Sequence, residues 1–432
     1  ISTYDNRFLY RFGCYACSAA PLIALTVRDG KAYDISANPG MLPAHRDWLG
    51  QIEDMVDPAE RWTSPGFLAG WIAAKFRVGE GEAAWAALTD NWDFANDQGE
   101  EVCLTGQPLD EFYEDRLRFV ELCERVGFRG YYLGEHHATP LCLAPSPSVF
   151  LAAIATRTDR IRFGTLVYAL PLYHPLRLLQ EICVLDQMGR GRLDLGVGRG
   201  ASPIETSFFG IDLADSEDIY RTYLDLILTG LTEGRLDGVW GDMSFDDVPL
   251  HVAPFQKPHP PLWYGAHSTD SAARAARMGS NIVSLDDAAQ TRTFADAFRT
   301  VWAEAQPAAA PEPLVGLGMP IVVAEDDDTA LEIARRAYPA WHKSFNWLYV
   351  ERNAPPPKRQ RPTEFDGLAA QGRAIAGSPA TVASFLKEAL EEAGANYFVG
   401  QFAFGDLSLA ELSASAELFA GDVMPALRAS LP

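Results

Sequence analysis

The stretch from Tyr131 to Gly210 constrains the fold more than any other part of this 432-residue chain. It contains three short apolar runs, separated by two segments in which apolar residues recur at helical spacing. The order strand, helix, strand, helix, strand predicts parallel βαβ units with right-handed crossovers. Each apolar run leads into polar residues, and in barrels of such units the chemistry occurs where strands end. The sequence therefore predicts several site residues on one rim.

The alternation of strands and helices continues to the end of the chain and predicts a (β/α)8 TIM barrel. Seven strands are predicted after residue 110, whereas a closed barrel needs eight. The missing first strand should precede a helix predicted at 111–128, and the segments 83–94 and 100–105 are the candidates for it. The seven predicted strands cover 131–137, 161–168, 193–200, 260–267, 281–284, 314–324 and 396–405.

We divide the chain near Gln107, because the periodicity is irregular before it and regular after it. Residues 108–432 are predicted to form the barrel, and residues 1–107 an irregular N-terminal extension in which the first barrel strand is also expected. Within the extension, residues 22–36 predict a β-hairpin. Cys14 and Cys17 form a single CxxC pair without nearby histidines, which predicts buried thiols and no metal site.

The composition limits the possible partners and the compartment. Asp and Glu outnumber Lys and Arg by 58 to 36, and this net charge of −22 argues against a nucleic-acid partner, because phosphate binding needs a basic face. No run of eighteen apolar residues is present, so no membrane span is predicted. Six cysteines are few for this length and are typical of reduced thiols, which predicts a cytoplasmic protein.

Glu135, His136 and His137 follow directly after a predicted strand. Adjacent residues at a strand end point to opposite sides, so one imidazole can face the barrel mouth while the other packs sideways. An imidazole titrates near neutral pH and is suited to proton transfer. A histidine that is merely hydrogen-bonded in a loop is the alternative. The chain has only eight histidines, so we favour a catalytic role for this group.

Three further strand ends carry candidate ligand contacts. The strand that ends near Val167 runs into two prolines, which is typical of a bulge whose backbone could face a flat heterocycle, although an ordinary loop has the same pattern. Arg199 can neutralise a phosphate, and Gly200 permits close approach of a ligand to the backbone. Ser268 lies at the start of a predicted helix, where free N–H groups can bind phosphate, and it is equally suited to a plain N-cap.

Residues from about 108 to 427 resemble the bacterial-luciferase-like flavin-dependent monooxygenases. The resemblance is carried by EHH, LPLYHPLRLLQE, LDQMGRGRLDLGVGRG and PPLWYGAHSTDSAARAARMG, in this order. It implies a (β/α)8 barrel that binds reduced FMN, or in some branches coenzyme F420, at the C-terminal rim of its strands. The loop 353–365 falls where the family has a mobile lid.

The resemblance also implies roles for individual residues. His136 is similar to the family's catalytic histidine, and Glu135 and His137 to its supports. Leu166 and Val167 match the position of a non-proline cis peptide against the flavin ring. The remaining implied contacts are to the flavin ring for Arg199, Gly200 and Ala201, and to the FMN phosphate for Gly265, His267, Ser268 and Ser271.

The implied activity is a monooxygenation in which a separate flavin reductase supplies reduced FMN, and dioxygen is used to oxygenate a small organic substrate. A homodimer is expected by analogy with the family. An F420-dependent oxidoreductase that transfers hydride on the same barrel is the alternative enzyme. A flavin-binding protein without catalytic activity is the alternative of another class.

Overall fold

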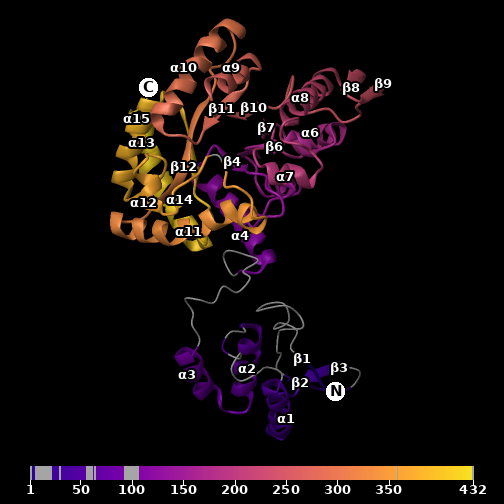
Figure 1. The fold of residues 1–432 in the computed structure, drawn as a ribbon, viewed down its shortest axis with the longest axis vertical. Coiled ribbons are helices and arrows are strands. Elements are labelled where there is room, and N and C mark those ends of the chain that lie inside the picture. The colour runs from indigo at the N-terminus through magenta and orange to yellow at the C-terminus, as the bar shows by residue number, and fades with distance from the viewer. Residues whose placement is uncertain are drawn as a thin grey trace. The chain divides into compact units, whose positions relative to one another are not determined.

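The computed structural model describes residues 2–4, 22–28, 31–54, 62, 65–91, 107–357 and 359–430. The chain divides into two compact units, residues 1–102 and 103–432, and each is described by itself (Figure 1). The predicted thiol pair Cys14 and Cys17 and the strand candidate at 100–105 lie outside the described residues.

In its described residues, the N-terminal unit combines a three-stranded antiparallel sheet with three α-helices. The hairpin predicted over 22–36 is confirmed as β2 and β3, and β1 pairs with the other edge of β2. The strand proposed at 83–94 is wrong, because α3 covers most of it. Ala84 and Leu88 are both buried there, and their spacing of four places them on one helix face. The bounds are β1 Ser2–Tyr4, β2 Leu22–Arg28, β3 Lys31–Asp34, α1 Leu42–Glu53, α2 Pro65–Arg77 and α3 Gly81–Asn91.

The second unit is built on a parallel sheet in the order β4, β5, β7, β10, β11, β12. The far edge of β12 pairs with β14 along its first half and with β13 along its second half. All seven strands predicted after residue 110 are confirmed, and the short β13 was not predicted. The bounds are β4 Gly130–Leu133, β5 Arg162–Thr165, β6 Tyr168–Ala169, β7 Leu193–Gly198, β10 Leu262–Gly265, β11 Asn281–Ser284, β12 Val315–Val323, β13 Ile375–Gly377 and β14 Tyr397–Gln401.

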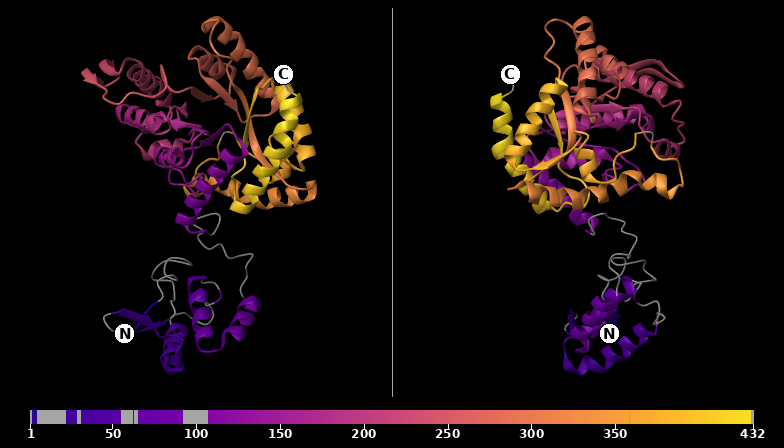
Figure 2. Two further views of the ribbon diagram at one scale, coloured as in Figure 1. Left: turned by 180° about the vertical axis from the view of Figure 1, so that it is seen from behind. Right: turned by 60° about the vertical axis from the view of Figure 1, so that its left-hand side comes forward.

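The helices of this unit surround the sheet, and β8 (Arg235–Trp240) and β9 (Met243–Pro249) form a separate hairpin (Figure 2). In α4, residues such as Phe112, Phe119 and Cys123 recur at helical spacing and are buried. In the part of the chain that the structure describes, no helix is both long and apolar enough to cross a membrane. The bounds are α4 Leu109–Val126, α5 Pro147–Arg157, α6 Pro175–Met188, α7 Pro203–Phe208, α8 Ser216–Glu233, α9 Thr269–Arg277, α10 Ala288–Ala305, α11 Asp327–Glu351, α12 Phe365–Ala369, α13 Pro379–Ala393, α14 Leu409–Leu418 and α15 Met424–Ser430.

Among the described residues, no strand lies between β4 and β14, and we call this gap the opening. Every residue of the central strands β7 and β12 is buried, whereas every residue of β4 and β14 is only partly buried. Among the described residues, β4 pairs only with β5, and β14 pairs only with β12. The two strands nevertheless face one another, because the rings of Phe128 and Phe402, which flank them, lie 5.4 Å apart. The α/β fold is therefore barrel-like, with an opening where the first strand was expected.

Candidate active site

Five adjacent parallel strands bring candidate site residues to one rim. His136 follows β4, Val167 follows β5, Arg199 follows β7, Ser268 follows β10 and Asp286 follows β11. Because the strands are parallel neighbours, their carboxyl ends lie at the same edge of the sheet. The structure thus gathers at one rim the strand ends that the sequence singled out, and adds that of β11.

Glu135 is fully buried and links the ends of two strands. Its Oε1 atom lies 2.7 Å from His137 Nε2, and its Oε2 atom accepts a hydrogen bond of 2.9 Å from the Ala169 N–H in β6. The ring of His137 packs edge-on against Phe209, with 4.8 Å between the ring centres. Glu135 therefore fixes the position of His137 and of the backbone beyond the Leu166–Val167 peptide bond.

The partner of His136 is a residue that we did not predict. Glu205 Oε1 lies 3.2 Å from His136 Nδ1, and Glu205 Oε2 accepts a 2.8 Å hydrogen bond from the His137 N–H. The roles of Glu135 and His137 as supports of His136 stay predictions, because the hydrogen bonds of the Glu135 carboxylate run to His137 and Ala169. The sequence did contain a signal. Ser202 and Glu205 have the spacing of a capping box, and the Ser202 hydroxyl accepts from the Glu205 N–H at 3.2 Å.

The residues that the resemblance places against the flavin ring differ in the groups that they direct toward the rim. The Leu166–Val167 peptide bond is cis, as expected at this position. Gly200 has φ +80°, a left-handed conformation that favours glycine, and Ala201 beside it is exposed. Arg199, in contrast, turns toward the start of α8, where its Nη1 atom lies 3.4 Å from the Ser216 hydroxyl. Its guanidinium is therefore already engaged at the side of the rim.

The start of α9 is arranged as an anion cradle. The Ser268 hydroxyl accepts from the Ser271 N–H at 3.2 Å, and the Ser271 hydroxyl accepts from the N–H groups of His267 and Ser268, both at 3.1 Å. The N–H groups of Thr269 and Asp270 have no acceptor among the described residues. N–H groups of this kind at a helix N-terminus, with the positive end of the helix dipole, favour a phosphate. Gly265 ends the strand that leads into the cradle.

Between α11 and α12, the structure describes residues 352–357 and 359–364, which contain most of the segment 353–365 that the resemblance implies to be a lid. We call this segment the lid loop, and Arg359 ties it to the cradle. Its Nη1 atom donates to both carboxylate oxygens of Asp286, at 2.8 and 3.0 Å, and its Nη2 atom donates to the His267 carbonyl at 2.7 Å. Burial alone would raise the pKa of Asp286, but hydrogen bonds from His267 and Arg359 outweigh it and lower that pKa below its ordinary value. This contact could not be predicted from the sequence, because Arg359 and Asp286 lie far apart in the chain.

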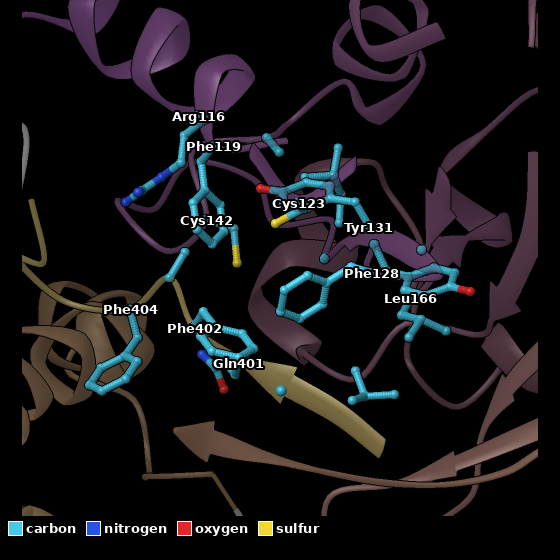
Figure 3. A pocket seen from close by; sticks show the side chains of 18 of the residues that line it. Arg116, Phe119, Cys123, Phe128, Tyr131, Cys142, Leu166, Gln401, Phe402 and Phe404 are labelled. Carbon is cyan, nitrogen blue, oxygen red and sulfur yellow. The ribbon is translucent and has the colours of Figure 1, made fainter. Parts of the chain in front are cut away.

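A cavity of about 770 Å³ begins at the rim and continues along the opening between β4 and β14 (Figure 3). His136 and Leu166 line it at the rim, and Arg361 reaches it from the lid loop. Further along, aromatic side chains such as Phe119 and Phe402 form its wall, as Figure 3 shows. An apolar cavity of this size with a few polar groups at one end is typical of a site for an organic molecule.

Comparisons with known proteins identify the type of barrel. The family model described as "Luciferase-like monooxygenase" matches residues 84–397, and the model "sll0997 C-terminal domain" matches residues 45–121. The uncharacterized protein y4wF of Sinorhizobium fredii is 38% identical over 304 residues, which cover 70% of this chain and 89% of that protein. The oxygenase component of the flavin-dependent trigonelline monooxygenase of Acinetobacter baylyi is 29% identical over 178 residues, 41% of this chain. The match spans 49% of that oxygenase.

Solved structures share the fold at low sequence identity. The oxygenating constituent of 3,6-diketocamphane monooxygenase from Pseudomonas putida, in complex with FMN, superimposes with a TM-score of 0.62 at 20% identity, over 74% of this chain and 95% of that one. An F420-dependent secondary alcohol dehydrogenase superimposes with a TM-score of 0.57 at 17% identity, over 73% of this chain and 95% of that one. The match of the family model to nearly three quarters of the sequence, together with the barrel-like fold, shows that this chain belongs to the luciferase-like monooxygenase family.

Proposed function

We propose that the chain is a monooxygenase that uses reduced FMN, supplied by a separate reductase, and dioxygen to oxygenate a small organic substrate. The observation that supports this most strongly is the shared rim, which carries the His136–Glu205 pair and the cradle at the start of α9, and from which the apolar cavity begins at His136. The similarity to the oxygenase component of a flavin-dependent trigonelline monooxygenase supports a separate reductase as partner.

The residues present fit FMN. The phosphate would lie on the N–H groups of Thr269 and Asp270, which have no acceptor among the described residues, beside the Ser268 hydroxyl. The ring would lie toward Leu166, Val167 and Gly200, where the close approach of backbone is possible. Bound FMN supplies the redox chemistry with dioxygen, and the protein supplies binding, orientation and exclusion of water.

His136 is placed to move a proton at the rim. Glu205 holds its Nδ1 atom, which leaves Nε2 as the ring nitrogen that can exchange a proton with a reactant in the cavity. The side chain is 32% exposed, whereas Glu205 is 12% exposed, so the carboxylate orients the imidazole from behind. The apolar wall of the cavity keeps bulk water from the reacting atoms.

Titration with FMN, measured by quenching of flavin fluorescence, tests the cradle. Ser268→Ala should weaken FMN binding by about 10- to 100-fold, because a hydrogen bond to a charged group is lost together with the helix cap. Ser378→Ala is the matched control, because Ser378 caps α13 in the same way outside the site. Riboflavin, which lacks the phosphate, should bind wild type and Ser268→Ala almost equally. Equal FMN affinities for both Ser→Ala variants would refute the phosphate assignment.

Reoxidation of photoreduced FMN by air, followed at 450 nm, tests the role of His136. His136→Ala should bind FMN within about threefold of wild type, because the imidazole is not part of the cradle, and its reoxidation rate should differ at least tenfold. An unchanged rate would contradict the proton-transfer role. Binding of F420 with tighter affinity than FMN would instead favour the hydride-transferring alternative, and retention of oxidised flavin without any effect on reoxidation would favour a non-catalytic binding protein.

A further inference from the structure

The lid loop carries a guanidinium that faces the cavity without an acidic partner. Arg361 lines the cavity, and among the described residues no carboxylate forms an ion pair with it and no acceptor receives a hydrogen bond from its side chain. Its guanidinium carbon lies 5.4 Å from the ring centre of Trp341 and 5.7 Å from that of Phe345. The two rings are themselves stacked, with 5.2 Å between their centres.

The electrostatic surroundings of Arg361 favour an added anion. Burial lowers the pKa of this guanidinium, and the positive charge of Arg373 lowers it further. Asp286 acts in the opposite direction, but its carboxylate is already held by Arg359. A partly desolvated cation without a partner is energetically unfavourable, so an added anion would stabilise it. Arg359, Arg361 and Arg373 lie together here although the chain as a whole has a net charge of −22.

The rest of the cavity suits an apolar body. Away from Arg361 it is walled by Phe119, Phe128 and Phe402, and the Cys123 thiol, whose pKa burial raises to about 12, contributes no charge at neutral pH. Contact with the two rings holds the Arg361 guanidinium in place, and its N–H groups, which have no acceptor among the described residues, can make a two-point contact with an anion. A ligand that fits both the Arg361 guanidinium and the aromatic wall of the cavity is apolar over most of its length and carries one anionic group.

We propose that Arg361 binds the anionic head group of the substrate, and that the substrate is an apolar organic acid whose hydrocarbon body lies along the opening between β4 and β14. This inference rests on the proposed function only for the reaction that the acid undergoes after it has bound. Its binding needs no flavin and is tested separately. Arg361 is then a residue that determines substrate specificity, distinct from the cradle for the cofactor.

Isothermal titration of the full chain with decanoate and with decanol, each with and without FMN, tests this inference. Wild type should bind decanoate at least tenfold more tightly than decanol. Arg361→Gln should weaken decanoate binding by about 10- to 100-fold and change decanol binding less than twofold, because only the charged hydrogen bonds are lost. Arg361→Lys should retain part of the preference. Arg352→Gln is the matched control, since Arg352 stacks on Phe208 outside the cavity.

Several outcomes would overturn the assignment. Equal affinities of wild type for decanoate and decanol would show that the cavity does not select an anion. A parallel loss of both ligands in Arg361→Gln would show that the side chain only supports the aromatic wall. A loss of FMN affinity with unchanged decanoate affinity would make Arg361 a cofactor ligand. If instead FMN does not bind while the decanoate preference and its loss in Arg361→Gln persist, the proposed cofactor fails and this inference stands.

Discussion

Replacement of Glu135 by alanine is expected to destabilise the barrel unit substantially, because this buried carboxylate holds the His137 imidazole and the Ala169 N–H by hydrogen bonds. The change removes the hydrogen bonds to His137 Nε2 and to the Ala169 N–H. Ala169 is only 8% exposed, so its N–H would remain unpaired in the interior. Loss of a partner for a buried polar group costs about 1–3 kcal/mol, which gives about 3 kcal/mol for the two groups together.

The expected shift in melting temperature follows from the size of the unit. A unit of 330 residues, Cys103–Pro432, has an unfolding entropy of roughly 0.7 kcal/mol/K, so Glu135→Ala should lower the Tm by about 4 °C in differential scanning calorimetry. Glu417→Ala is the control, because Glu417 forms only an exposed pair with Arg125 and should shift the Tm by less than about 1.5 °C. Equal shifts in the two variants would refute the view that Glu135 ties β4 to β6.

Three further predictions concern the sheet and the lid. In β4, the backbone N–H groups of alternate residues point toward β5. The Tyr132 N–H, which points away from β5, should therefore exchange with deuterium much faster than the Tyr131 N–H, and equal protection of both would show that another strand covers this edge. The pKa of Asp286 is lowered in the folded state, so its link to the lid loop should be intact above about pH 4 and be lost as the pH falls further. Proteolysis within the loop should therefore rise in acid in wild type but not in Asp286→Asn. Gly196→Ala should prevent folding, since a Cβ there would overlap the carbonyl oxygen of Thr165, whereas Gly421→Ala, with open space around it, should fold normally; soluble yield and circular dichroism decide.

The regular part of the fold was predictable because each element carries its own periodic signal. The helix predicted at 111–128 is found as α4, Leu109–Val126, since its apolar residues recur at helical spacing. The segment 83–94 was misassigned although its alanines favour a helix, and the burial of Ala84 with Leu88 shows the helical spacing. The short β13, with three residues, is too brief to produce a pattern.

The site was predictable where it depends on strand ends and not where it depends on contacts across the fold. His136 and Ser268 follow strands, and their positions at the rim follow from parallel topology alone. Arg359 and Asp286 are 73 residues apart, and no local pattern joins them. The buried pair of Arg162 with Asp194, at 2.7 Å, is of the same kind. Partners of this type depend on side-chain direction in the assembled barrel, which a single sequence does not encode locally.

The opening between β4 and β14 makes one space available to two kinds of occupant. A fully closed barrel offers no backbone groups to other chains, whereas the outward edges of these strands present N–H and C=O groups that have no partner among the described residues. The cavity runs along those same edges. An extended polypeptide that added itself as a strand would therefore displace whatever small molecule the cavity holds, and a well-bound small molecule would in turn protect the protein against self-association at high concentration.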